Sequence, residues 1–245
     1  MLNLSLVALI IFGSSVINAL TGFGFIIVAA PVLVHLLAPK DVAATALLLG
    51  FVISVLVVWK EREHIDLRVV GFMAFAALFG IPLGTAILER VSGSMLKVLV
   101  GSVVILATVP LSAGLQLPKR HARPLSAASG FLSGVLAGIC GISGAIAALF
   151  FMGQGWEPHK IRPTISGFNA VVSSLTLMWL LTTHSIGRNE VLSAAMFLPL
   201  VFIGLALSNL VRPRVDGRHF RTITFVLVVV AGALAVIAGV VEMVR

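Results

Sequence analysis

The sequence predicts an all-α integral membrane protein. We expect two inverted repeats of about five hydrophobic segments each, with glycine-broken helical hairpins that meet at the bilayer midplane. Three observations predict this fold class. Of the 245 residues, 59% are hydrophobic and only 11% are charged, whereas a soluble domain is about 25% charged. Long apolar stretches recur along the chain, and the two halves share a spacing of glycines and prolines.

The apolar stretches are separated by charged residues, proline or glycine. A bilayer core of about 30 Å needs about 20 helical residues, so most of these stretches can span a membrane. Three of them are short and raise the question of how they cross: 24–38, 125–138 and 142–153. The approximate stretches are 2–20, 24–38, 42–59, 67–88, 94–115, 125–138, 142–153, 161–183, 190–210 and 220–243.

The placement of Lys and Arg indicates whether 2–38 and 125–153 are each one bent span or a hairpin of two passes. As single spans they leave eight basic residues on one side of the membrane and nine on the other. As hairpins they gather twelve on one side and five on the other. Cytoplasmic loops carry the excess of Lys and Arg. We therefore expect ten segments, with both chain ends outside and the basic loops in the cytoplasm.

An internal repeat supports the ten-segment arrangement. A shift of 119 residues places Gly22 on Gly141, Pro39 on Pro158 and Thr45 on Thr164. The first repeat is predicted to cover 1–118 and the second 119–245, within a single membrane domain. Because each half has an odd number of segments, the second half enters the membrane inverted, an arrangement common among secondary transporters.

The segment Gly138–Gly144 interrupts a long apolar run with three glycines in seven residues. Each glycine costs roughly 1 kcal/mol relative to alanine in a helix interior. A helix broken there exposes backbone N–H and C=O groups, which a membrane protein tolerates only where they line a cavity or are buried in protein. Thr21–Gly24 is a fainter copy in the first half. Both breaks are therefore candidate sites.

The distribution of charge favours an anionic or neutral solute over a cation. Every Asp and Glu lies in a loop or at the end of a segment, so no carboxylate is expected near the bilayer centre, where cation transporters generally place one. Helices that restart at Gly24 and Gly144 would present free N–H groups and the positive end of the helix dipole, which together form an anion site.

Polar residues near the breaks have two interpretations. Asn18, Cys140 and Ser143 lie beside the breaks, and Thr45 and Thr164 begin the following segments in repeat-matched positions. Such residues either contact the substrate or serve close helix packing and bonds to backbone carbonyls. Asn169 has the same two interpretations.

Other functional classes are not favoured. Lys40 and Lys160, close to repeat-matched, either attract anions to the two entrances or end a hairpin at the interface. The net charge of +8 is interpreted as anchoring to anionic membrane lipid rather than binding to nucleic acid. The histidines are too far apart in sequence to indicate a metal site, and no cofactor is expected. The single cysteine excludes an intramolecular disulfide. The sequence leaves a homodimer open.

One enzymatic alternative exists. Gly141–Gly144 matches the G-x-S-G pattern of rhomboid-type intramembrane serine proteases, with Ser143 as nucleophile and His184 as its partner. A serine nucleophile needs a base within hydrogen-bond reach. His184 is expected at an outer loop, and the first-half copy has no serine, so the motif is better explained by its glycines. No catalytic residue is therefore assigned.

The order of the motifs resembles the sulfite exporter TauE/SafE family of bacterial membrane transporters over about residues 5 to 240. The resemblance begins with Thr21-Gly22-Phe23-Gly24, followed by Pro31 and the segment Pro39–Thr45. It continues with the motifs Gly80-Ile81-Pro82-Leu83-Gly84, Gly130-Phe131-Leu132-Ser133-Gly134 and Gly141-Ile142-Ser143-Gly144. The last motif is less glycine-rich than the family pattern G-x-G-G-G-x.

The resemblance implies an exporter or exchanger of small sulfur-containing anions, such as sulfite, sulfoacetate or related sulfonates, and not an enzyme. Its mechanism would be alternating access around a central site; another small solute is the alternative. The resemblance also implies which residues line the substrate site or lie next to it: Asn18, Gly22, Phe23, Gly24, Thr45, Cys140, Gly141, Ile142, Ser143, Gly144 and Thr164.

Overall fold

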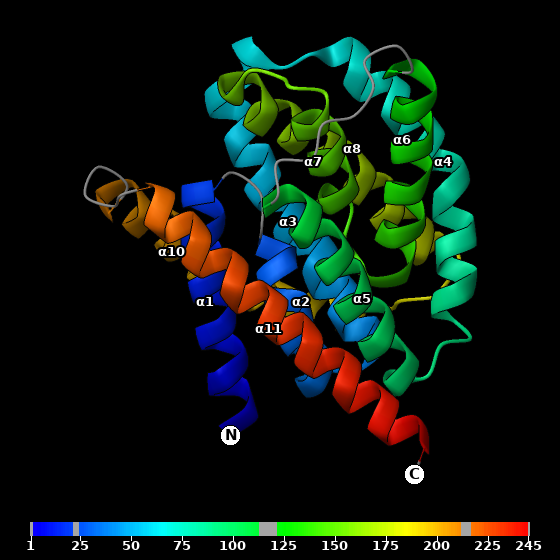
Figure 1. Cartoon of the computed structure of the whole chain (residues 1–245). Coiled ribbons are helices and arrows are strands. Elements are labelled where there is room, and N and C mark those ends of the chain that lie inside the picture. The colour runs from blue at the N-terminus through cyan, green and yellow to red at the C-terminus, as the bar shows by residue number, and fades with distance from the viewer. Residues whose placement is uncertain (1, 22–24, 113–121, 212–216, 245) are drawn as a thin grey trace.

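The computed structural model describes residues 2–21, 25–112, 122–211 and 217–244, and within these ranges the chain forms helices joined by short turns, with no strand (Figure 1). The predicted all-α fold is confirmed. The helices are α1 (Leu2–Thr21), α2 (Phe25–Leu36), α3 (Pro39–Glu61), η1 (Arg62–His64), α4 (Leu67–Leu88), α5 (Gly93–Ser112), α6 (Ala122–Cys140), α7 (Gly144–Gly153), α8 (Pro158–Thr182), α9 (Arg188–Ala195), α10 (Leu198–Val211) and α11 (Gly217–Val244).

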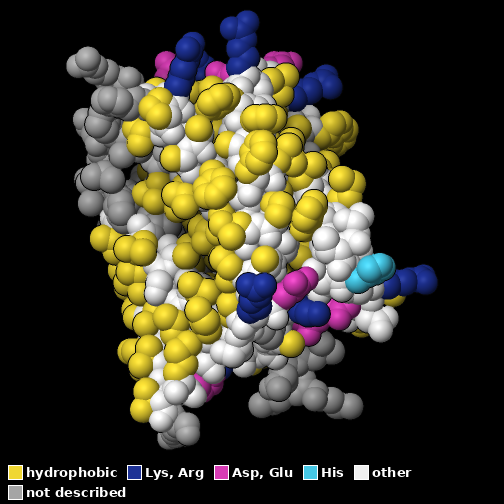
Figure 2. Space-filling model, turned by 90° about the vertical axis from the view of Figure 1, so that its right-hand side faces the viewer, with side chains coloured by type: hydrophobic (Ala, Val, Ile, Leu, Met, Phe, Trp, Pro, Cys, Tyr) yellow, Lys and Arg dark blue, Asp and Glu magenta, His cyan; other side chains and the backbone are white. Residues whose placement is uncertain are grey.

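The surface of the protein suits a bilayer. Within the described residues, four helical segments are long and apolar enough to cross a membrane: Lys40–His64, Leu67–Leu88, His159–Thr182 and Arg188–Leu207. Figure 2 shows hydrophobic side chains over the middle of one face, with charged side chains gathered towards its ends. Phe75 and Phe79 of α4 are 60% and 64% exposed, as expected of side chains that contact lipid rather than water.

Contacts between two connections support a hairpin for α6 and α7. Glu61 at the end of α3 pairs with Arg162 near the start of α8, with 3.2 Å between Oε1 and Nη1. The rings of His64 and His159 are 5.5 Å apart, edge to face. The α3–α4 and α7–α8 connections therefore lie on the same side of the protein. The single-span count would place them on opposite sides.

The two hairpins pair a long helix with a short one. Helix α1 has 20 residues and α6 has 19, whereas α2 has only 12 and α7 only 10. At 1.5 Å per residue, α2 and α7 are about 18 Å and 15 Å long, roughly half of a 30 Å hydrocarbon core. Because Gly144 at the start of α7 lies beside the middle of α8, the chain break before α7 lies inside the membrane. Residues 22–24, where the sequence predicts the first break, are outside the described residues.

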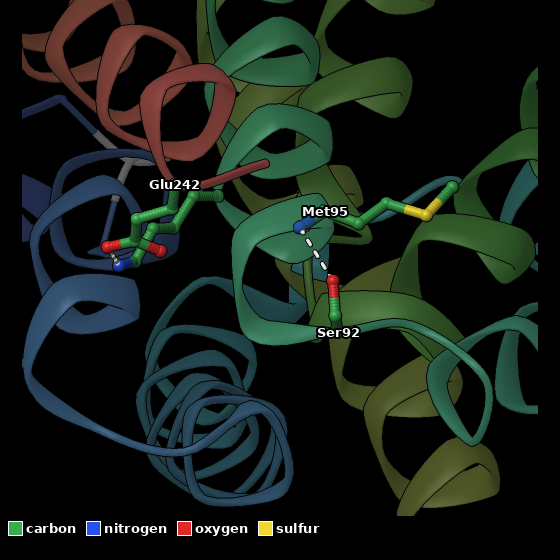
Figure 3. A network of polar contacts seen from close by, with 4 residues as sticks. Ser92, Met95 and Glu242 are labelled. Carbon is green, nitrogen blue, oxygen red and sulfur yellow. Dashed lines mark hydrogen bonds and ion pairs between the residues drawn. The ribbon is translucent and has the colours of Figure 1, made fainter. Parts of the chain in front are cut away.

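Helices α5 and α11 cross closely and are joined at one end by an ion pair between Lys97 and Glu242 (Figure 3). Nearby, the Ser92 hydroxyl accepts a hydrogen bond of 3.3 Å from the Met95 N–H and so caps the start of α5. The Lys97 side chain is only 13% exposed, and the Glu242 carboxylate compensates its charge at this partly buried position.

Helices α4 and α6 pack backbone to backbone. Gly130, Gly134 and Gly138 follow one another at every fourth residue of α6, so they form one stripe along the helix. A β-carbon at Gly134 would overlap the Ala77 carbonyl and lie 2.8 Å from its Cα. Small residues in such a stripe let membrane helices approach closely. This contact holds α6 in place and with it the chain break at its end.

Replacing Gly134 with alanine is expected to destabilise the protein by about 1–3 kcal/mol, because the added methyl forces the two backbones apart. The control is Gly71→Ala on α4, where nothing lies within 4 Å of the added carbon; this change should be neutral or stabilise by up to ~1 kcal/mol. Thermal unfolding in detergent measures both variants. Equal melting temperatures would contradict the close α4–α6 contact.

Candidate functional site

The chain break between α6 and α7 is formed by a left-handed glycine. The N–H of Gly141 donates to the Ala137 carbonyl at 2.9 Å and completes the last turn of α6. Gly141 has φ of +76°, a conformation that non-glycine residues rarely adopt. It also touches α3, since an added β-carbon would lie 2.6 Å from Cβ of Ala46. Gly141 is therefore required both by the turn and by its contact with α3.

Ser143 occupies the N-cap position of α7 without capping the helix. Its side chain makes no hydrogen bond to the first turn of α7; its hydroxyl instead donates to Oδ1 of Asn169 on α8 at 2.9 Å. The first-turn N–H groups of α7 thus lack the side-chain acceptor that helix starts usually have. The serine is held in place by α8, and its side chain does not cap the helix start.

The Asn169 amide lies directly against the start of α7. Its Nδ2 is 2.7 Å from the position that a β-carbon on Gly144 would occupy, so any larger residue at 144 would displace the amide. Asn169 is the twelfth of the 25 residues of α8, near the middle of the helix. Asn169 and Gly144 are both partly exposed at this depth. The polar groups at this depth are therefore not fully enclosed by the protein.

The predicted site residues around this break fall into two groups. Gly141, Ser143 and Gly144 meet Asn169 or α3 as described. Cys140 and Ile142 are buried among apolar side chains of α2 and α5, and the Cys140 thiol donates to the Leu136 carbonyl at 3.4 Å. The substrate-binding assignment of these residues stays a prediction. Four predicted residues cannot be placed: Gly22, Phe23 and Gly24 lie outside the described residues, and so does the side chain of Asn18.

The two repeat-matched threonines have different surroundings. The Thr164 hydroxyl accepts a hydrogen bond of 3.3 Å from the Asp66 N–H, so it fixes the start of α4. It precedes Asn169 by five residues, about 7.5 Å along the helix. Thr45 is buried on the turn of α3 that carries Ala46, the residue that Gly141 touches. Their contact with substrate stays a prediction.

The predicted entrance lysines are both exposed. Lys160 pairs with Glu157, with 3.1 Å from Nζ to Oε2. Its side-chain hydrogen bond holds the pKa of the Glu157 carboxyl below the usual value, so much of the charge of Lys160 is locally compensated. The attraction of anions by Lys40 and Lys160 stays a prediction.

Two buried serines were missed by the sequence analysis. Ser54 of α3 is 5% exposed and Ser173 of α8 is 1% exposed. Ser173 lies one turn beyond Asn169 on the same face of α8. The two serines are 119 residues apart in the sequence, so the repeat used above could have identified them.

The geometry does not form a serine-protease site. The Ser143 hydroxyl donates to an amide oxygen, which is not a base. His184 is exposed in the turn after α8, 15 residues beyond Asn169, or roughly 22 Å along a helix axis. Within the described residues, no group of three His, Cys, Asp or Glu side chains could hold a metal ion.

Comparisons with known proteins give the following results. The model of the family described as sulfite exporter TauE/SafE matches residues 6–235. A protein of Cupriavidus necator, named probable sulfite/organosulfonate exporter TauE, is 28% identical over 224 residues; the matched region covers 88% of this chain and 87% of the relative. No solved structure matches the chain.

Proposed function

The chain belongs to the sulfite exporter TauE/SafE family, and on this premise we propose that it carries small sulfur-containing anions, such as sulfite or organosulfonates, across a bacterial inner membrane. The protein is a multi-pass membrane transporter rather than an enzyme. The observation that supports an anionic substrate best is the uncapped start of α7, beside the hydrogen-bonded pair Ser143 and Asn169.

This site offers what an oxyanion needs. The first N–H groups of α7 have no partner within the helix, and the helix dipole there is equivalent to roughly half a positive charge. Nδ2 of Asn169 adds donors beside Gly144. Sulfite and sulfonates present oxygen atoms to such donors from a compact head group. The relative from Cupriavidus necator, whose name includes sulfite and organosulfonate, supports the same class of substrate.

The packing of the helices supports two inverted repeats, 1–118 and 119–245. We match α1 to α6, α2 to α7, α3 to α8, α4 to the α9–α10 segment, and α5 to α11. The contact of α4 with α6 then corresponds to that of α10 with α1, and that of α2 with α11 to that of α7 with α5. Exchanging the two repeats exchanges α3 with α8 and α5 with α11, so the α3–α8 contact and the α5–α11 contact are each unchanged. This is the pattern that a two-fold axis in the membrane plane produces.

We propose alternating access as the mechanism. The α3–α8 contact lies on the expected axis and forms one wall of the break, since Gly141 touches α3 and Ser143 bonds to α8. Rocking of the two repeats about this contact would open the start of α7 to one side of the membrane at a time. Asn169 would stay beside the substrate in both states, because it lies on α8, one of the two helices of this contact.

The proposal is tested by anion flux in proteoliposomes that contain the purified protein. Sulfite and methanesulfonate should leave loaded proteoliposomes faster than they leave protein-free vesicles. Acetate should leave both kinds of vesicle at the same rate. Ser143→Ala should lower the flux several-fold, since the Asn169 amide loses its partner. Ser174→Ala is the control, because Ser174 is exposed and its hydroxyl donates to the Val171 carbonyl of its own helix. Absence of flux with every sulfur anion would refute the proposed function.

A further inference from the structure

The site around Asn169 contains no ionised side chain. Residues 42–59, 124–156 and 163–187, which supply α3, α6, α7 and α8 around the break, contain no Asp, Glu, Lys or Arg. The nearest charge along α8 is Arg162, seven residues before Asn169 and about 10 Å away along the helix. Arg162 pairs with Glu61. On α5, which packs against Ile142, the charged Lys97 pairs with Glu242. The groups of α3, α6, α7 and α8 that face a bound anion are therefore neutral donors.

Ser173 supplies a donor that the protein itself does not use. It is 1% exposed, and its hydroxyl has no hydrogen-bond partner among the described residues. A buried hydroxyl without a partner is costly. Ser173 follows Asn169 by four residues, so the two side chains share one face of α8. A ligand bound beside Asn169 is thus within reach of a second side chain from the same helix.

Ser54, the repeat partner of Ser173, lies at about the same depth as Asn169. Ser54 precedes Glu61 by seven residues, and Asn169 follows Arg162 by seven. Because α3 and α8 pack together and Glu61 pairs with Arg162, Ser54 and Asn169 are each about 10 Å from that pair along their helices. Two neutral polar side chains, one from each repeat, therefore lie at a similar depth in the protein.

We infer that this site, with Ser173 among its donors, takes oxyanions with one net charge in preference to those with two; the inference rests on the proposed function. The cost of moving an ion from water into a low-dielectric medium rises with the square of its charge. The attraction to fixed dipoles rises only linearly. A helix start equivalent to about half a charge, with neutral side-chain donors, can balance one negative charge but leaves a second uncompensated.

Methanesulfonate and sulfate form a matched pair of ligands, since both are tetrahedral and of similar size, with one and two charges. Competition against sulfite efflux from proteoliposomes should be at least tenfold stronger for methanesulfonate. Sulfite efflux should also slow as the pH rises through neutrality, because hydrogensulfite becomes a dianion, while methanesulfonate efflux stays constant. Equal or stronger competition by sulfate would overturn the charge preference and leave the proposed transport intact. Absence of efflux of any anion would overturn both.

The position of the site is tested by Ser173→Ala, with Ser174→Ala as the control on the exposed face of α8. Half-saturation for methanesulfonate should rise about tenfold in the first variant and remain at the wild-type value in the second. The melting temperature in detergent without ligand should not fall for Ser173→Ala, since no protein contact of its hydroxyl is lost. An unchanged half-saturation value would remove Ser173 from the site.

Discussion

Gly141→Ala is expected to abolish anion flux through the protein. The substitution has two costs in free energy. A side chain in the left-handed conformation costs roughly 1–2 kcal/mol, and the added methyl would lie 2.6 Å from Cβ of Ala46, which adds an overpacking cost of about 1–3 kcal/mol. The α6–α7 turn must move away from α3, and Ser143 moves with it. Efflux of methanesulfonate from proteoliposomes measures the loss.

Gly155→Ala separates the two costs. Gly155 has φ of +69° in the turn after α7 but nothing within 4 Å of an added β-carbon, so this variant carries the conformational cost alone and should keep most of the flux. Removing the clash by combining Gly141→Ala with Ala46→Gly should restore part of it. Wild-type flux in Gly141→Ala would show that the contact between this turn and α3 is not needed for transport.

Asn169→Asp should reduce anion flux even more strongly than Asn169→Ala. Alanine removes Nδ2 and the acceptor of Ser143; hydrogen bonds to a charged group contribute about 1.5–3 kcal/mol, which corresponds to roughly 10–150-fold in affinity. Aspartate keeps the shape and the acceptor but places a negative charge beside the bound anion. Half-saturation and maximal flux for methanesulfonate distinguish a loss of binding from a loss of turnover.

Asn189→Asp is the matched control, because it makes the same chemical change at an exposed position near the start of α9. It should transport like the wild type. Size-exclusion profiles and melting temperatures of all three variants show whether each is folded. A folded Asn169→Asp protein with wild-type flux would exclude Asn169 from the substrate site and would leave the start of α7 without its supporting donor.

Hydropathy and charge alone were sufficient for the fold class and for the hairpins. A run of apolar residues specifies a membrane helix wherever its partners lie, and each Lys or Arg reports its side of the membrane. The glycines of Gly138–Gly144 identified the break for a similarly local reason, since helix propensity is a property of the residues themselves. The family match is consistent with these local signals.

The lengths of α2 and α7 and the composition of the site were decided by tertiary structure. Ser143 bonds to a residue 26 positions away, Thr164 to one 98 positions away, and Gly141 meets Ala46 only because α3 crosses the break. No periodicity within one segment encodes such pairs. Small polar residues serve packing or binding equally well by type, and only the packing of α3, α7 and α8 shows which hydroxyls the protein uses itself and which it leaves free.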